Sequence, residues 1–123
     1  MISRLLRANS LALIFGACLA GTAAASTAFD GNWSVVIYTR SGACDAAYRS
    51  GVQIQNGIIF PDASGFNWSG RVAPKGAVRV SVSAGGQSAS GSGRLSRNLG
   101  GGTWRGQGNR GGCSGTWVAE RRR

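Results

Sequence analysis

Beyond Ala28 the sequence alternates between apolar and polar residues in short runs, and turns that contain glycine separate these runs. No window places apolar residues at the spacing of an amphipathic helix, whereas alternation with a period of two is typical of a β-strand that buries one face. In residues 33–39, for example, Trp33, Val35 and Ile37 share one face. The pattern therefore restricts the chain to an all-β fold.

Several turns can be placed from their residues. Asn56-Gly57 is the strongest two-residue hairpin signal and joins the alternating run 48–55 to residues 58–60. The run 66–72 should form a hairpin with the run that follows residues 74–76, and a further hairpin should turn at Gly85-Gly86. We predict eight antiparallel strands in up-and-down order.

The register of these hairpins follows from the requirement that apolar residues face apolar residues or glycine, because a slip of one residue turns every side chain to the other face. The predicted opposite pairs are Val72 with Val78, Trp68 with Val82, Val82 with Ala89, Val80 with Gly91, and Trp104 with Trp117 across a loop at 109–112. All of these apolar residues are thereby expected on the inner face.

The N-terminal residues have the features of a secretory signal peptide. Arg4 and Arg7 precede an apolar stretch too short to span a bilayer, and Ala23-Ala24-Ala25 supplies the small residues of a cleavage site. We predict a signal peptide at 1–25, with cleavage after Ala28 as the alternative, and a single barrel domain at 26–123 without a transmembrane span. The protein is then periplasmic or secreted, and lipidation at Cys18 is a further alternative.

Removal of that segment leaves Cys44 and Cys113, an even pair in an oxidising compartment. Cys44 follows the first predicted strand and Cys113 begins the last one. If these two strands pair antiparallel, the cysteines come together, and a disulfide between them fits a closed barrel of about eight strands with no free edge. A sandwich of two sheets is the alternative.

The composition argues against an enzyme. The chain has no histidine, which removes Ser-His-Asp and Cys-His catalysis and imidazole metal sites. The four acidic residues, Asp30, Asp45, Asp62 and Glu120, fall in separate loops and in the last strand. Turn capping or charge compensation explains each of them better than a carboxylate pair that cleaves glycosides. We expect no catalytic residues and no metal site.

Four tryptophans, Trp33, Trp68, Trp104 and Trp117, fall on the predicted inner face. In a barrel this small they can simply fill the core, with glycines opposite them to make room. The alternative is that they hold a small apolar ligand, as the interiors of lipocalin-like barrels do.

The arginines define the expected binding surface. The chain has a net charge of +10, and Lys75 is its only lysine. The predicted register turns Arg71, Arg79, Arg94 and Arg105 outward and pairs Arg71 with Arg79 and Arg94 with Arg105, which makes one basic stripe. Because guanidinium groups bind phosphate and carboxylate in a bidentate manner, we expect an anionic partner: lipopolysaccharide, lipid headgroups, acidic polysaccharide or an exported protein. The alternative is a solvated face that keeps the protein soluble.

Specific nucleic-acid binding is not expected. The sequence has a single RGG, at 110–112, and few exposed aromatic residues on which bases could stack. Residues 106–111 have the glycine spacing of the dinucleotide-binding fingerprint. That motif requires a helix after it, whereas a strand is predicted there, so the match is a coincidence.

The sequence resembles a group of small exported proteins of alphaproteobacteria, mostly from rhizobia. The matching stretches are FDGNWSVVIYT, GACDAAYRSGVQIQNG, ASGSGRLS, GGGTWRG and CSGTWVAERR, which span nearly all of the chain beyond Ala28. Members of this group often carry automatic labels such as haem utilisation or adhesion exoprotein, so the resemblance implies an exported protein of that kind. With no histidine and no methionine beyond Met1, the chain offers haem only Tyr38 and Tyr48, and we expect no cofactor.

A second resemblance is to the periplasmic barrel inhibitors of metalloproteases, through Gly31-Asn32-Trp33 followed by Cys44. In that family the N-terminal segment reaches the protease cleft, which implies such a role for residues 26–30. The family closes a short disulfide within its first third, whereas Cys44 here has no partner before Cys113. Protease inhibition is the alternative function.

Overall fold

The structure, a computed structural model, describes residues 27–62 and 67–122. The strands are β1 (Gly31–Ser41), β2 (Ala47–Gln55), β3 (Ile58–Pro61), β4 (Asn67–Val72), β5 (Ala77–Ala84), β6 (Gln87–Ser96), β7 (Leu99–Gly108) and β8 (Gly111–Arg121). The predicted signal peptide and Cys18 lie outside the described residues, as does Phe66. Within those residues no helix is long and apolar enough to cross a membrane.

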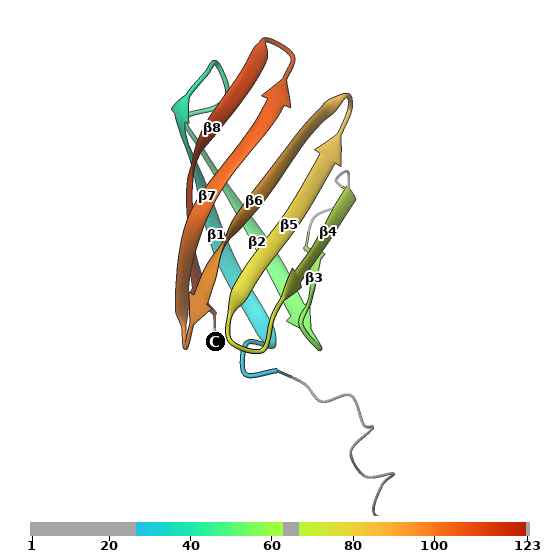
Figure 1. The fold of residues 1–123 in the computed structure, drawn as a ribbon, viewed down its shortest axis with the longest axis vertical. Coiled ribbons are helices and arrows are strands. Elements are labelled where there is room, and N and C mark those ends of the chain that lie inside the picture. The colour runs from blue at the N-terminus through green and yellow to red at the C-terminus, as the bar shows by residue number, and fades with distance from the viewer. Residues whose placement is uncertain (1–26, 63–66, 123) are drawn as a thin grey trace, which may run out of the picture.

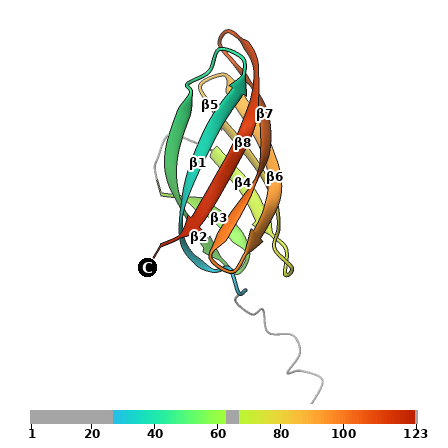
Figure 2. The same ribbon diagram turned by 90° about the vertical axis from the view of Figure 1, so that its left-hand side faces the viewer.

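The eight strands form a closed antiparallel barrel in which each strand pairs with the next. The barrel closes where β1 pairs with β8, from Trp33 opposite Arg121 to Ser41 opposite Ser114. Figures 1 and 2 show the long strands inclined around the barrel axis. The predicted up-and-down barrel is therefore confirmed, and the sandwich alternative is wrong, because closure pairs the first strand with the last.

The predicted disulfide between Cys44 and Cys113 is present, with the two Cα atoms 6.2 Å apart. It ties the loop after β1 to the start of β8, at the end of the barrel that also holds the β5–β6 and β7–β8 turns (top of Figure 1). We call this end the rim. The opposite end, with residues 27–30 and the β2–β3, β4–β5 and β6–β7 turns, is called the base.

Two of the predicted registers are confirmed. Val72 lies opposite Val78 and Trp68 opposite Val82 in β4–β5, and the β5–β6 hairpin pairs Val82 with Ala89. The β4–β5 turn, residues 73–76, contains the expected residues 74–76, and the β5–β6 hairpin turns at residues 85–86 as expected.

The register of β7–β8 differs from the prediction. Trp104 lies opposite Gly115, and Trp117 opposite Gly102, so the two indoles are not partners. The turn contains two residues, Asn109 and Arg110, instead of the predicted loop at 109–112. The reason is space on the inner face, because a glycine opposite each of these two indoles leaves room that a second indole would fill.

The register of β6–β7 differs as well. Arg94 lies opposite Gly101 and Arg105 opposite Ser90, so the predicted pairing of Arg94 with Arg105 is wrong. Ser96 pairs with Leu99, and the turn between them is made by Arg97 and Asn98. Arg97 takes a positive φ of 54°, a conformation that arginine seldom adopts, so the sequence carried no turn signal there.

The hydrophobic core lies toward the base. Its buried residues are Phe29, Trp33, Val52, Ile54, Ile59, Val72, Val78, Leu95, Trp117 and Ala119. Val35, Ile37, Trp68 and Trp104 pack against this core and are only partly buried. The interior is thus tightly packed at the base and more open toward the rim.

The base is closed by the turn that precedes β1. Phe29 is 7% exposed, and its carbonyl oxygen accepts a hydrogen bond of 2.8 Å from Nε1 of Trp33. The guanidinium of Arg121 lies 4.8 Å from the centroid of the Trp33 ring and donates hydrogen bonds to the carbonyl oxygens of Ala28 and Asp30. The first and last strands are therefore fastened together across the base.

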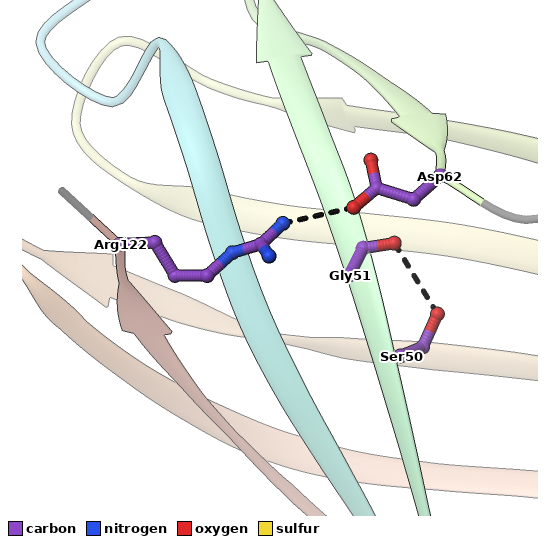
Figure 3. A network of polar contacts seen from close by, with 4 residues as sticks. All are labelled: Ser50, Gly51, Asp62 and Arg122. Carbon is purple, nitrogen blue, oxygen red and sulfur yellow. Dashed lines mark hydrogen bonds and ion pairs between the residues drawn. The ribbon is translucent and has the colours of Figure 1, made fainter.

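A second contact of the C-terminal residues lies on the outside. Arg122 reaches across β1 and forms an ion pair of 2.8 Å with Asp62, which follows β3 (Figure 3). The pair passes over Gly51 of β2, where a Cβ atom would lie 2.8 Å from Nη2 of Arg122. Both side chains are nearly half exposed, so this ion pair contributes at most about 1 kcal/mol to the free energy of unfolding.

Candidate binding groove

The outer surface of the barrel has a broad, shallow groove of about 1280 Å³. Outward side chains of β4 to β8 form most of it, and Arg40 of β1 and Ile58 and Phe60 of β3 lie at its two sides. The outward residues with polar or charged side chains are Arg40, Ser69, Arg71, Arg79, Ser81, Ser90, Ser92, Thr103, Arg105, Ser114 and Thr116. Arginine and hydroxyl groups thus dominate this surface.

The strand register arranges these side chains in two rows across the barrel. Successive cross-strand partners in the first row are Ile58, Arg71, Arg79, Ser92, Thr103, Thr116 and Tyr38. In the second row they are Ser69, Ser81, Ser90, Arg105, Ser114 and Ser41. Neighbouring members of a row are about 4.8 Å apart, which is the distance between hydrogen-bonded strands.

The groove is electrostatically unbalanced. Its lining includes four arginines, Arg40, Arg71, Arg79 and Arg105, and no aspartate or glutamate. Among the described residues the only ion pair is that of Arg122 with Asp62, which lies elsewhere. Arg71 and Arg79 are direct cross-strand partners, and like charges in such positions repel each other. An anion bound between them would relieve this repulsion.

The structure brings together three of the four predicted anion-binding arginines. Arg71, Arg79 and Arg105 line the groove, whereas Arg94 lies nearer the base, where its Nη1 donates a hydrogen bond of 3.0 Å to the carbonyl oxygen of Lys75. Arg40 was not predicted to belong to the surface. Its place depends on the pairing of β1 with β8 and on the irregular register between Thr39 and Ser41, and no local signal in the sequence reveals either.

Arg40 also has an aromatic neighbour. Its guanidinium carbon lies 5.6 Å from the centroid of the Tyr38 ring, at the end of the first row. This contact holds a cation over an aromatic face at one side of the groove.

The four acidic residues lie in different parts of the fold. Asp62 is bound to Arg122, and Glu120 is exposed in β8. Asp30 accepts hydrogen bonds from Oγ1 of Thr27 and from the backbone amides of Asn56 and Gly57. Partial burial raises the pKa of Asp30, but these hydrogen bonds outweigh it and hold the pKa below the ordinary value of 3.8.

The remaining acidic residue, Asp45, is exposed in the rim loop, where its carbonyl oxygen accepts a hydrogen bond from Oγ1 of Thr39. Residues 27–62 and 67–122 contain no group of three histidine, cysteine, aspartate or glutamate side chains that could hold a metal ion.

All four tryptophans lie on the inside of the barrel wall, around one interior cavity. Trp33 is almost fully buried, with an exposure of 1%. Nε1 of Trp104 donates to the carbonyl oxygen of Tyr38, and Nε1 of Trp117 donates to that of Ser92. The tryptophans therefore fill the core toward the base and also form walls of the cavity above it.

No protein-family model, no curated protein and no solved structure matches this chain.

Proposed function

We propose that the protein is an exported binding module that holds an acidic polysaccharide in the groove on its outer surface. The observation that carries this proposal is the charge of the groove, whose lining combines four arginines with no carboxylate. Guanidinium groups bind carboxylate in a bidentate manner, so an array of them suits a polymer of acidic sugars.

The hydroxyl groups favour a polysaccharide over a lipid headgroup. Serine and threonine side chains flank the arginines in both rows, for example Ser90 and Ser114 on either side of Arg105 in the second row. A chain of acidic sugars presents hydroxyl and carboxylate groups along its whole length, and rows that cross six or more strands offer partners for several sugar units. A single headgroup would use only a small part of this surface.

The setting of the protein is part of the same proposal. The disulfide between Cys44 and Cys113 suits an oxidising compartment, in agreement with the predicted export to the periplasm or beyond. Acidic polysaccharides occur on the outside of cells, where such a module meets them.

The alternative, protease inhibition by the N-terminal segment, gains no support from residues 27–30. Phe29 is buried in the base, and the Asp30 carboxylate is held by the amides of Asn56 and Gly57. A segment fastened in this way is not free to extend into a protease cleft.

The test is binding of alginate oligomers, measured by calorimetry, to the wild type and to the triple variant Arg71→Gln/Arg79→Gln/Arg105→Gln. Each exposed arginine contact contributes about 0.5 kcal/mol, so we expect the triple variant to bind roughly tenfold more weakly. Added salt should weaken binding by the wild type more than binding by the variant.

The matched control is Arg49→Gln/Arg97→Gln/Arg110→Gln, which removes the same charge from outside the groove. This variant should bind alginate almost as tightly as the wild type does. Equal losses in both variants would show that net charge alone attracts the polymer. Binding of anionic phospholipid vesicles in preference to alginate would replace the polysaccharide with a membrane surface as the partner.

A further inference from the structure

The interior of the barrel contains a cavity of about 220 Å³ above the packed base. Its walls are almost entirely aliphatic and aromatic, and Tyr48 and Ser50 supply the few polar side chains on the inner face. No charged residue lines it. For comparison, an engineered apolar cavity of about 150 Å³ in another protein binds benzene.

One polar atom in the cavity wall is unpaired. Nε1 of Trp68 is buried from solvent and has no hydrogen-bond partner among the described residues. The other three tryptophans of the cavity wall all donate from Nε1 to a backbone carbonyl oxygen, those of Phe29, Tyr38 and Ser92. A buried donor without a partner is unfavourable, and an acceptor brought by a ligand would remove that cost.

We propose that this cavity is a binding site for a small neutral molecule, aromatic or short-chain, with one carbonyl-type acceptor that takes the hydrogen bond of Trp68. Scaling from benzene in the smaller cavity, the volume suits a ligand of about nine non-hydrogen atoms. A charged ligand does not fit, because an ion without a partner in apolar surroundings is strongly disfavoured.

Access to the cavity is from the rim. A second hollow, of about 390 Å³, lies beside the disulfide and shares Ile37, Tyr48, Val82, Ala89 and Trp104 with the cavity wall. Polar residues surround the outer part of this hollow, among them Thr39, Asp45, Gln87 and Gln107. The base offers no such route, because Phe29 and Trp33 are buried there. The shared wall residues therefore indicate a route for a small ligand from the rim rather than from the base.

The interior site and the outer groove share wall residues such as Trp68 and Trp104, but the arginines on which the proposed function rests do not line the cavity. Outward and inward side chains alternate along each strand, so Arg71, Arg79 and Arg105 face away from the cavity. The two sites differ in the ligand chemistry that they suit, and variants of one should leave the other intact.

The test uses acetophenone and isopropylbenzene, two molecules of nearly the same shape of which only the first has a carbonyl acceptor. Binding to the mature protein is followed by NMR of the tryptophan indole N–H groups. Acetophenone should bind about fivefold more tightly than isopropylbenzene, which is the ratio expected for one net hydrogen bond. It should also move the indole resonance of Trp68 downfield, while isopropylbenzene leaves that resonance without such a shift.

Three variants separate the contribution of the Trp68 N–H group to ligand affinity from the contributions of the cavity volume and of the groove arginines. Trp68→Phe keeps an aromatic ring but removes the donor, so it should lose the preference for acetophenone and bind isopropylbenzene at least as tightly, because the carbonyl group would then be buried without a partner. Val82→Phe fills the cavity from its wall and should abolish binding of both. Arg71→Gln/Arg79→Gln should bind both probes as the wild type does, even if its affinity for alginate is reduced.

Two outcomes would overturn the proposal. One is the absence of saturable binding of either probe to the wild type. The other is binding without preference for acetophenone and without a shift of the Trp68 resonance. Both are measured on the wild type, so the test does not depend on the folding of any variant.

Discussion

At the scale of single residues, the partners of an arginine decide its role in this protein. Arg121 stacks on Trp33 and donates to carbonyl oxygens of the base, which makes it part of the core closure. Its neighbour Arg122 forms an exposed ion pair with Asp62. Arg71 forms no ion pair with a described residue and lies opposite Arg79. Arginine therefore stabilises the fold at the base, and at the groove it supplies positive charge.

Asp30 leads to a prediction about pH. Its pKa is lowered in the folded protein, so the ionised carboxylate stabilises the fold above that pKa, and this contribution is lost as the pH falls through the folded value. Asp30→Asn should therefore lower the free energy of unfolding at pH 7, and the difference from the wild type should shrink as the pH falls below 3.8. Urea unfolding at several pH values measures this.

The control for that experiment is Asp45→Asn, because the Asp45 side chain is exposed at the rim and makes no hydrogen bond among the described residues. This substitution should change the free energy of unfolding by less than about 0.5 kcal/mol at pH 7. If the Asp30→Asn difference is the same at pH 7 and at pH 3, the hydrogen bonds from Asn56 and Gly57 do not depend on the charge of Asp30.

At the scale of the strands, glycine determines where the large rings can lie. The Trp117 ring extends over Gly102 of β7 to Gly93 of β6, where its Nε1 reaches the carbonyl oxygen of Ser92. A Cβ atom at Gly93 would clash with the backbone carbonyl oxygen of Gly101 in β7 and would lie 2.6 Å from Cζ2 of Trp117. Glycines in the middle of strands usually weaken a sheet, and here they are needed because the backbones of β6 and β7 approach closely and, at Gly93, an indole occupies the remaining space.

We predict that Gly93→Ala lowers the free energy of unfolding by about 1–3 kcal/mol, the usual cost of overpacking a core. The matched control is Gly112→Ala in β8, where a Cβ atom would meet its nearest neighbours at 3.8 Å or more. That substitution should change stability by less than about 0.5 kcal/mol. Equal effects of the two substitutions in urea unfolding would show that the Trp117 ring does not require the space over Gly93.

At the scale of the whole molecule, the barrel is closed at the base by its own core and fastened at the rim by its disulfide. The base joins residues before β1 to the end of β8 through Arg121, and the rim joins the loop after β1 to the start of β8 through Cys44 and Cys113. The seam between the first and last strands is therefore secured at both ends. This arrangement leaves the interior near the rim free to hold a ligand.

The disulfide leads to the prediction at this scale. It links residues 69 positions apart, and in the chain-entropy model the loss of such a bond costs about 4 kcal/mol. We expect Cys44→Ser/Cys113→Ser to lower the free energy of unfolding by about this amount in urea. Reduction of the wild type should have the same effect, and the double variant should not respond to the reductant. A loss below about 1 kcal/mol would mean that the seam holds without the bond.

Much of the fold could be predicted from local patterns. The alternation in residues 33–39 and the turn at Asn56-Gly57 are local features, and the structure has β1, β2 and β3 where these features place them. The two predicted pairings in β4–β5 also hold, because each face of these strands has one polarity. Predictions failed where a turn carried no signal, as at Arg97, and where two large rings competed for the same space, as with Trp104 and Trp117.

The candidate sites depended more on the tertiary structure. The sequence could identify Arg71 and Arg79 as outward neighbours, because they flank one short hairpin. It could not place Arg40 at the groove, since that position follows from closure of the barrel between β1 and β8. Nor could it single out Trp68 among four similar tryptophans, because an unpaired indole N–H is recognised only when every neighbouring acceptor has been placed.

The sequence by itself determined the strand order, the inward and outward faces of the strands, and which two cysteines form the disulfide. It could do so because period-two alternation and turn residues act over a few neighbouring positions. Only the tertiary structure decided the registers of β6–β7 and β7–β8, the closed base, the arginines that share the groove and the cavity beside Trp68. These features arise from the packing of large side chains across the closed barrel, where each ring takes space that residues far apart in the sequence must leave to it.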